Sequence, residues 1–320
     1  YKRNSFYPGN LAELDESYIL RDLRGQTVLF YPVQYNPVTK ILRIYSEINI
    51  EIVASSNSLS INSKSRNSNK ISTSSEFLHI YEDLFINNLN DTRFEYLTDE
   101  GKMLIVCYDD FLDEMQPLVD WKNRKGIHTD IIGISDVGSD ISSLQNYIDS
   151  YYYGNGLTYL LLVGDINQIP THIVNGAASD PSFGFIEGDD SFAEVIVGRF
   201  SANNPLELQT QIDRTLSYEI NPESVDYLDK ALGIGSTQGP GYGGLTDAEF
   251  EDLLWNDFLS NYTYDSFEGI YDGSGSVAQG VAAINEGVGI INYTGHAGPT
   301  GWGNGAPLGV NDVNDLVNTG

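Results

Sequence analysis

Cysteine is almost absent from this 320-residue chain, and basic residues are scarce. The single cysteine, Cys107, excludes an internal disulfide. Only 17 lysines and arginines face 45 aspartates and glutamates, which gives a formal net charge of −28. Because such a surface repels phosphate backbones and anionic membranes, we expect no nucleic-acid or bilayer partner. No apolar run is long enough to span a membrane, so we expect no membrane span.

The excess of acidic residues suits three kinds of protein. It is typical of a solvated extracellular protein, of a chain with calcium sites, or of a pocket that attracts basic side chains. The opening YKRNSFYPGN does not read as a natural start, and the closing NDVNDLVNTG reads as a helix with a glycine cap. We therefore expect the chain to be an internal piece of a longer polypeptide.

Residues 1–54 show the alternation of a β-rich segment. Apolar and polar positions alternate in TVLFYPVQY and ILRIYSEINIEIV, on either side of the turn Asn36-Pro37. This pattern predicts a β-hairpin with one buried face.

A Ser/Asn-rich linker is expected at 55–76. It has almost no large apolar residues and cannot bury enough surface to fold by itself. Lys64, Arg66 and Lys70 lie in it, and an exposed, flexible, basic stretch is where a trypsin-like protease would cut.

From about residue 96 onward, strand patterns alternate with helix patterns. The apolar run MLIVCY precedes a helical stretch that ends at Gly126, and the cycle restarts after Pro222 with ALGIGS. Such alternation predicts parallel sheets covered by helices on both faces. The restart predicts two α/β subdomains, at 96–226 and 227–320, the second truncated.

His296 is the first candidate for chemistry. The predicted strand GVGIINYTG leads to Gly295-His296-Ala297-Gly298, ahead of Trp302. Ligands of open α/β sheets bind beyond the carboxyl ends of strands, and small neighbours let a substrate backbone approach. The alternative is that His296 lies in a glycine-rich loop and has no catalytic or binding role.

A histidine base needs a nucleophile, and the chain offers no convincing one. Cys107 sits in the middle of a predicted buried strand, where it should behave as a small hydrophobe. No G-x-S-x-G elbow is present. We therefore expect no complete catalytic dyad within these residues.

Two acidic features also attract attention. Asp190 and Glu194, with backbone carbonyls between them, could wrap a hard cation such as Ca²⁺, although a solvated acidic turn explains them equally well. Asp247 follows a glycine-rich loop at a predicted helix start, where a carboxylate is favourable in any case. Its functional alternative is a carboxylate at a pocket edge that faces a basic substrate side chain.

Several long stretches together resemble the catalytic domain of the gingipains, peptidase family C25, in the family's order and at similar spacings. The resemblance covers roughly residues 96–320, and the upstream ILRDLRGQTVLFYPVQYNPVTKILRIYSEINIEI resembles the end of the family's propeptide. The stretches are VDWKNRKG, LTYLLLVGDINQIP, SDPSFGFIEGDDSFAEVIVGRFS, LQTQIDRTLSYE and GIINYTGHAGPTGWG.

The resemblance implies a caspase-like α/β/α sandwich of two subdomains with mostly parallel sheets, preceded by a β-rich propeptide segment. It implies peptide hydrolysis by a Cys-His pair, with His296 as the catalytic histidine and the nucleophilic cysteine beyond Gly320. Ala297 stands at the position of the oxyanion-hole amide, where gingipains have glycine. Gln238 stands where the arginine-specific enzymes have an acid, and a glutamine can orient an imidazole without stabilising its charge.

The resemblance also implies substrate and metal contacts. Asp247 aligns with the aspartate that selects a basic P1 residue, across a short gap, and Trp302 is assigned to substrate binding with it. A structural Ca²⁺ is implied at the acidic stretch, with no organic cofactor. Its ligands would be the side chains of Asp190 and Glu194 and the backbone carbonyls of Glu187 and Phe192.

The functions that remain open are three. The first is a secreted or cell-surface endopeptidase that acts on protein and peptide substrates and has its own propeptide as a partner. It would be made as a zymogen, activated by cleavage near residues 64–70, and exported by a type IX-like system of a Bacteroidetes-type bacterium. The second is a sortase-like transpeptidase of that system, and the third a C25-like surface module without activity. The nucleophile could also lie on a second chain, as in two-chain caspases.

Overall fold

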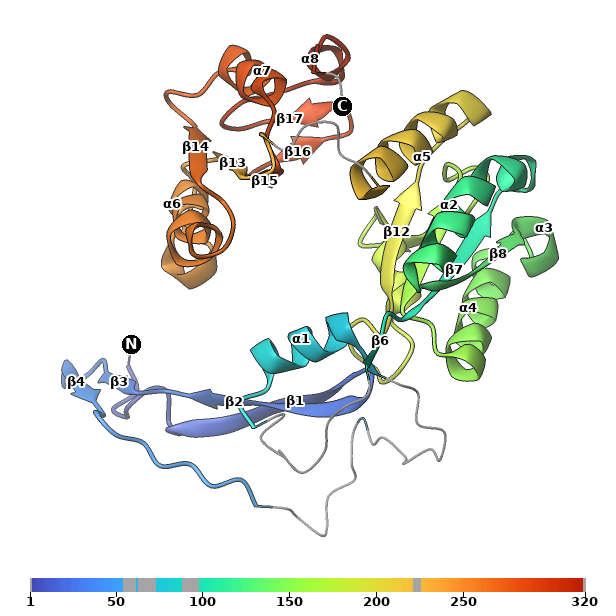
Figure 1. Ribbon diagram of the computed structural model, residues 1–320. Helices are drawn as coiled ribbons and strands as arrows, with labels where there is room; N and C mark the ends of the chain where they lie inside the picture. Colours follow the sequence, from blue (N-terminus) through green and yellow to red (C-terminus); the bar gives the residue numbers. More distant parts are fainter. Residues whose placement is uncertain (1, 54–61, 63–72, 88–97, 221–225, 319–320) are drawn as a thin grey trace. The chain divides into compact units, whose positions relative to one another are not determined.

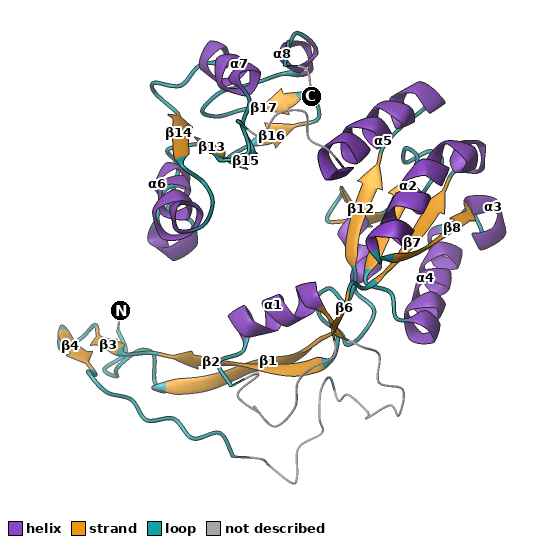
Figure 2. Cartoon of the chain, viewed as in Figure 1, coloured by secondary structure: helices purple, strands orange, loops and turns teal. Residues whose placement is uncertain are grey.

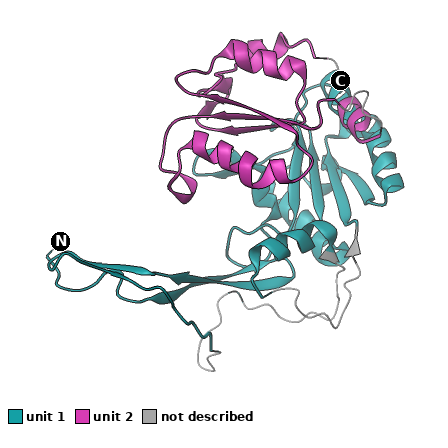
Figure 3. Cartoon of the chain, turned by 60° about the vertical axis from the view of Figure 1, so that its left-hand side comes forward, with its two compact units in different colours: residues 1–212 teal, residues 213–320 magenta. Residues whose placement is uncertain are grey.

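The computed structural model describes residues 2–53, 62, 73–87, 98–220 and 226–318 (Figures 1 and 2). Its contacts divide the chain into two compact units, residues 1–212 and 213–320 (Figure 3). The predicted cleavage residues Lys64, Arg66 and Lys70 lie outside the described residues. None of the described helices is long and apolar enough to cross a membrane.

The first unit begins with two hairpins. Strands β1 (Ala12–Leu20) and β2 (Leu23–Phe30) pair antiparallel through a tight turn at Arg21, whose φ is 48°. Strands β3 (Val33–Asn36) and β4 (Ile41–Ile44) form the hairpin predicted at Asn36-Pro37.

The prediction of a buried face fails for β4. Every residue of this strand is exposed, because no element in the described part of the chain covers its apolar side chains. Helix α1 (Ser75–Leu84) instead packs on the first hairpin, where Phe77 and Tyr81 form a small core with Leu20.

A parallel four-stranded sheet in the order β12-β9-β7-β8 forms the body of the first unit. The buried runs predicted from the sequence become its central strands, and α4 covers one face with Leu144, Ile148 and Tyr152. Gly126 ends α2 with φ 102°, and Asp140 caps α4. The elements are β5 (Thr73–Ser74), β6 (Thr98–Asp99), β7 (Lys102–Cys107), α2 (Leu112–Lys125), β8 (His128–Gly133), α3 (Ile134–Val137), α4 (Ile141–Asn155), β9 (Tyr159–Val163), β10 (His172–Val174), β11 (Ala177–Ser179), β12 (Ile196–Phe200) and α5 (Pro205–Ile220).

The second unit is a parallel three-stranded sheet in the order β14-β13-β15, with α6 and α7 on opposite faces (Figure 3). The predicted parallel sheets with helices on both faces are therefore present. Helix α6, whose start was predicted at Asp247, widens into a π-turn at 254–258. The elements are β13 (Lys230–Gly235), α6 (Asp247–Leu253), β14 (Ser266–Tyr271), α7 (Val277–Glu286), β15 (Ile290–Thr294), β16 (Ala297–Gly298), β17 (Gly301–Trp302) and α8 (Val310–Asn314).

Candidate functional site

His296 lies just beyond the carboxyl end of a sheet strand, as predicted. Strand β15 ends at Thr294 and runs parallel to the central strand β13. The chain then turns back through β16 and β17, which pair Ala297 with Trp302. The carboxyl ends of parallel strands are where α/β proteins assemble their binding sites.

A network of hydrogen bonds fixes the backbone of His296. Its N–H donates to Oδ1 of Asn304 at 2.9 Å, and Asn304 Nδ2 donates to Oδ2 of Asp272 at 2.9 Å. Oδ1 of Asp272 accepts the N–H of Gly305 at 2.7 Å, and this bond is the main reason why the pKa of Asp272 lies below its ordinary value. The ionised Asp272 therefore anchors the loop that holds His296.

Aromatic residues hold the other side of this turn. The rings of Tyr293 and Trp302 stack with their centroids 4.6 Å apart. The hydroxyl of Tyr293 donates to the carbonyl of His296, which also accepts the N–H of Gly303 at 2.7 Å. Trp302, predicted to bind substrate, thus lies next to His296, but one of its faces is already covered.

Gln238 contacts the imidazole directly. Its Oε1 lies 3.1 Å from Nε2 of His296, and its own N–H donates to Oγ of Ser236 at 3.0 Å. Since an amide oxygen can only accept, this contact assigns the proton of a neutral ring to Nε2. Nδ1 then keeps its lone pair and can act as a base.

Asp247 belongs to the same network. It is the first residue of α6, after the N-cap Thr246, and its N–H donates to the carbonyl of Gln238 at 3.0 Å. Its Oδ2 accepts the hydroxyl of Ser236. The carboxylate is partly exposed. The structure thus joins Gln238, Asp247 and His296 in one cluster.

Cys107 is the small buried hydrophobe that its sequence context predicted. It is fully buried in β7, and its Sγ lies 3.3 Å from the carbonyl oxygen of Tyr108. Burial, followed by the nearby carboxylates of Asp109 and Glu114, raises the pKa of the thiol to about 12. A thiol so protonated is a poor nucleophile at neutral pH.

The acidic turn, for which calcium was predicted, contacts the N-terminal hairpin. The fully buried Glu194 accepts the N–H groups of Ile186 and Glu187 on Oε2, at 2.8 and 2.9 Å, and that of Arg21 on Oε1, at 3.3 Å. Burial raises the pKa of Glu194, and these hydrogen bonds offset part of the rise.

Asp190 is engaged in the same way. Its Oδ2 accepts the N–H of Ile19 at 2.8 Å, and its Oδ1 accepts the N–H of Phe192 at 3.0 Å. The Phe192 ring stacks on Tyr18 at 4.0 Å, which adds an apolar contact with the hairpin.

While the hairpin is docked, the candidate calcium ligands already have other hydrogen-bond partners. The carboxylate oxygens of Asp190 and Glu194 face N–H donors, and the Glu187 carboxylate turns away to accept the hydroxyl of Tyr152 at 2.8 Å. Within the described ranges, no three His, Cys, Asp or Glu side chains converge as a metal requires. Calcium at this turn stays a prediction.

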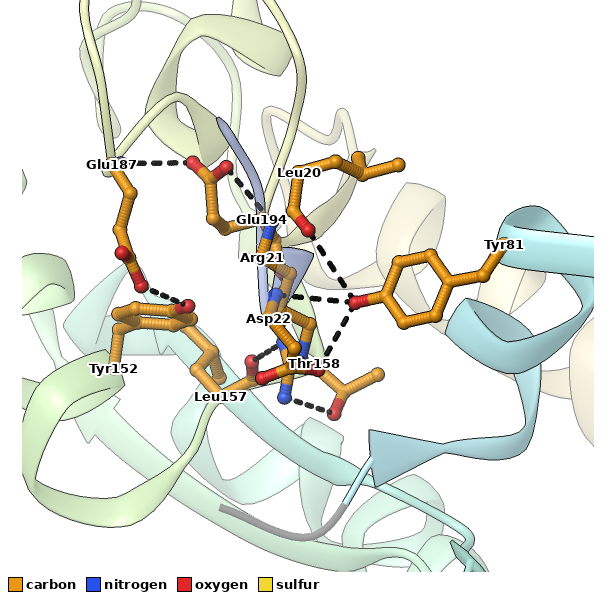
Figure 4. Close-up of polar contacts among 9 residues, drawn as sticks. All are labelled: Leu20, Arg21, Asp22, Tyr81, Tyr152, Leu157, Thr158, Glu187 and Glu194. Atoms are coloured by element: carbon orange, nitrogen blue, oxygen red, sulfur yellow. Dashed lines mark hydrogen bonds and ion pairs between the residues drawn. The ribbon is translucent and has the colours of Figure 1, made fainter. Parts of the chain in front are cut away.

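Arg21 is the residue of this contact that the sequence reasoning missed (Figure 4). It is only 1% exposed. Its Nη1 donates to the carbonyls of Leu157 at 2.6 Å and of Glu194 at 2.8 Å. The guanidinium carbon lies 4.8 Å from the centroid of the Phe77 ring and 5.6 Å from that of Tyr152. A basic residue at the tight turn of a hairpin was the available signal.

Asn304 and Asp272 were also missed, because nothing in the sequence shows that their side chains meet His296. The only hint was the polar Asn304 within the glycine-rich segment that follows the histidine.

Comparison with known protein families covers almost the whole chain. The family model for peptidase family C25 matches residues 96–320, and that for the C25 propeptide matches residues 1–86. The propeptide match extends through α1, whereas the sequence placed the end of the propeptide at residue 54.

The curated relatives are proteins of Porphyromonas gingivalis. Gingipain R2 is 37% identical over 328 residues, covering 100% of this chain and 44% of that protein. Lys-gingipain is 26% identical over 334 residues, covering 94% of this chain and 18% of that protein. The chain thus spans less than half the length of these relatives.

Solved structures of gingipains are also similar to this chain. The crystal structure of the Arg-specific cysteine proteinase gingipain R is 35% identical with a TM-score of 0.64, covering 68% of this chain and 52% of that one. The complex of Porphyromonas gingivalis RgpB pro- and mature domains is 34% identical with the same TM-score, covering 68% and 53%. The chain therefore belongs to peptidase family C25, with residues of the family's propeptide preceding those of its catalytic domain.

Proposed function

We propose that the protein is a cysteine endopeptidase in which His296 is the catalytic base. The observation that supports this most directly is the contact of Gln238 with Nε2 of His296, which leaves the lone pair of Nδ1 available. The nucleophilic cysteine is expected beyond Gly320, in the same polypeptide or in a partner chain.

The chemistry follows from this ring orientation. Nδ1 of His296 takes the proton of the thiol, and the thiolate sulfur attacks the carbonyl carbon of the scissile peptide bond. The imidazolium then gives its proton to the leaving amine as the C–N bond breaks. Water, activated by the same imidazole, hydrolyses the thioester and regenerates the thiol. The N–H of Ala297 is proposed to stabilise the oxyanion.

Specificity for a basic P1 residue is proposed to depend on Asp247. Asp247 is tied to Gln238 through its backbone N–H and to Ser236 through its carboxylate. These bonds hold the partly exposed carboxylate in place to face an arginine or lysine side chain. Relatives named as Arg-specific and as Lys-gingipain both occur in the family. Trp302 is proposed to contribute the rest of its exposed surface to the substrate pocket.

The N-terminal hairpin is proposed to be the end of an inhibitory propeptide that is separated by cleavage in the 55–76 linker. Its support is the match of residues 1–86 to the C25 propeptide and the buried attachment of Arg21. The processed enzyme would act outside the cell or at its surface, after export of the zymogen by a type IX-like system.

We also propose that calcium and the docked hairpin compete for the acidic turn. The oxygens of Asp190 and Glu194 that calcium would need accept N–H groups of Ile19 and Arg21. Release of the hairpin would free Oε1 of Glu194. Oδ2 of Asp190 would be freed once Asn62, whose Nδ2 lies 3.4 Å from it, leaves together with Ile19.

The test uses the complete polypeptide, including the residues after Gly320. His296→Ala should abolish hydrolysis of Arg- and Lys-containing peptides without lowering the Tm. His79→Asn, at a side chain 79% exposed, is the matched control and should leave turnover unchanged. Retained turnover in His296→Ala would refute the role of His296. Transfer of the acyl group to an added amine would identify the protein as a transpeptidase. Absence of turnover in the processed wild type would identify it as an inactive module.

A further inference from the structure

Glu251 is a buried carboxylate that the proposed chemistry does not use. It lies on α6, is 1% exposed, and its Oε1 accepts two hydrogen bonds. The donors are Nδ2 of Asn292 and Oγ1 of Thr294, each at 2.7 Å. Both donors are on β15 and two residues apart, so they share one face of that strand.

The sheet is shaped to receive this carboxylate. A Cβ placed on Gly233, in the central strand β13, would lie only 3.0 Å from Oε2 of Glu251 and 2.7 Å from the ring of Phe267. The glycine therefore leaves the space that the acid fills. A carboxylate in a prepared slot costs free energy of desolvation, and its hydrogen bonds to β15 offset part of that cost.

Glu251 joins the two elements that bear the proposed catalytic cluster. Thr294 is the last residue of β15, two positions before His296. Asp247 lies four residues before Glu251 on α6, which places the two residues on the same side of the helix. The hydrogen bonds of Glu251 thus tie the helix of the proposed specificity residue to the strand that ends at the proposed base.

The opposite face of β15 is held independently. Tyr293 points away from Glu251, because successive side chains of a strand alternate, and it stacks on Trp302. Loss of the bonds to Glu251 would therefore release one face of the strand end and leave the other in place.

We propose that Glu251 is a positioning residue, which sets the end of β15 and with it the imidazole of His296 relative to Gln238 and Asp247. This inference rests on the proposed function. It adds a residue that touches neither substrate nor nucleophile.

The experiment compares four variants of the complete, processed enzyme. Glu251→Leu removes the acceptor at similar volume, Glu251→Gln retains an acceptor oxygen, and Thr294→Val removes one donor. The control is Asp252→Asn, an exposed neighbour on α6 that contacts Tyr271 of β14 and not β15. Active sites are counted by thiol titration, and kcat and KM are measured on a basic peptide beside the Tm.

Glu251→Leu should lower kcat about tenfold to a hundredfold per active site, because small misplacements of catalytic groups have effects of this size. Thr294→Val should lower it less. Glu251→Gln should retain most of kcat, and Asp252→Asn all of it. The inference is overturned if folded Glu251→Leu keeps the wild-type kcat, or if Glu251→Gln loses as much as Glu251→Leu.

A second readout does not depend on turnover. The ¹⁵N–¹H spectrum of the imidazole should show the Nε2–H tautomer of His296 in the wild type and a tautomer mixture in Glu251→Leu. If the wild type hydrolyses no peptide, the proposed function fails, yet this spectrum still decides the positioning. An unchanged His296 signal in Glu251→Leu would refute it.

Discussion

Oε1 of Gln238 lies 3.1 Å from Nε2 of His296, although 58 residues separate them in the sequence. The two residues follow β13 and β15, which are adjacent and parallel, so their carboxyl ends meet at one edge of the sheet. The contact orients the imidazole through a neutral amide. A carboxylate at this place would add a charge to the same orientation.

Gln238→Glu should shift the acidic limb of the kcat/KM profile to higher pH, by about one unit. A carboxylate beside the ring favours the imidazolium, so the free base is lost at a higher pH on acidification. Peptide hydrolysis measured from pH 4 to 9 tests this. Gln279→Glu, at the first turn of α7, is the charge-matched control and should leave the profile unchanged. An unshifted limb in Gln238→Glu would show that Gln238 does not contact the working base.

Arg21→Ala should detach the N-terminal hairpin from the residues that match the catalytic domain. Truncation leaves the buried carbonyls of Leu157 and Glu194 without their charged donor, a loss on the order of 3 kcal/mol. After cleavage of the linker, gel filtration should show the hairpin retained in the wild type and released in the variant. Arg43→Ala, an exposed arginine on β4, is the control and should retain it. Equal retention in both variants would contradict the anchoring role.

Calcium should stabilise the protein only after the hairpin has left the acidic turn. In the intact chain we expect millimolar calcium to leave the Tm unchanged, because the oxygens of Asp190 and Glu194 already accept N–H groups. In Arg21→Ala, calcium should raise the Tm through binding to the native state. Adding Asp190→Asn should remove that rise. A calcium-dependent Tm in the intact wild type would refute the competition.

Cys107 should resist alkylation in the folded protein. With a pKa of about 12, about one thiol in ten thousand is ionised at pH 8, and the sulfur is fully buried besides. Iodoacetamide at pH 8 followed by peptide-mapping mass spectrometry should find Cys107 unmodified in the native state and modified after denaturation. Rapid native labelling would show that β7 opens.

Much of the fold was predictable because the signals are local. Continuous apolar runs gave the buried parallel strands, and Gly126 marked a helix end through its tolerance of positive φ. The exposed β4 and the π-turn after α6 were not predictable, since packing against neighbours decides whether an apolar strand is covered or a helix widens.

The candidate site was likewise predictable in part. Its proposed residues followed from strand-end position and from a family resemblance. Their hydrogen bonds did not, because Asn304, Asp272 and Glu251 reach the His296 turn from other segments. The acidic turn shows most clearly how far prediction from sequence reaches. Its sequence suits calcium, yet its carboxylates accept hydrogen bonds from the backbone of a hairpin about 170 residues away.

By itself, the sequence determined the alternating α/β pattern, the family, the burial of Cys107 and the place of His296 after a strand. Only the tertiary structure decided that Gln238 meets the imidazole, that Glu251 holds the end of β15, and that Arg21 is buried against Leu157 and Glu194. The physical reason is the distance along the chain over which each kind of interaction acts. Backbone preference and hydrophobic periodicity act between near neighbours in the chain, whereas a buried polar side chain takes whichever partner the fold brings within about 3 Å.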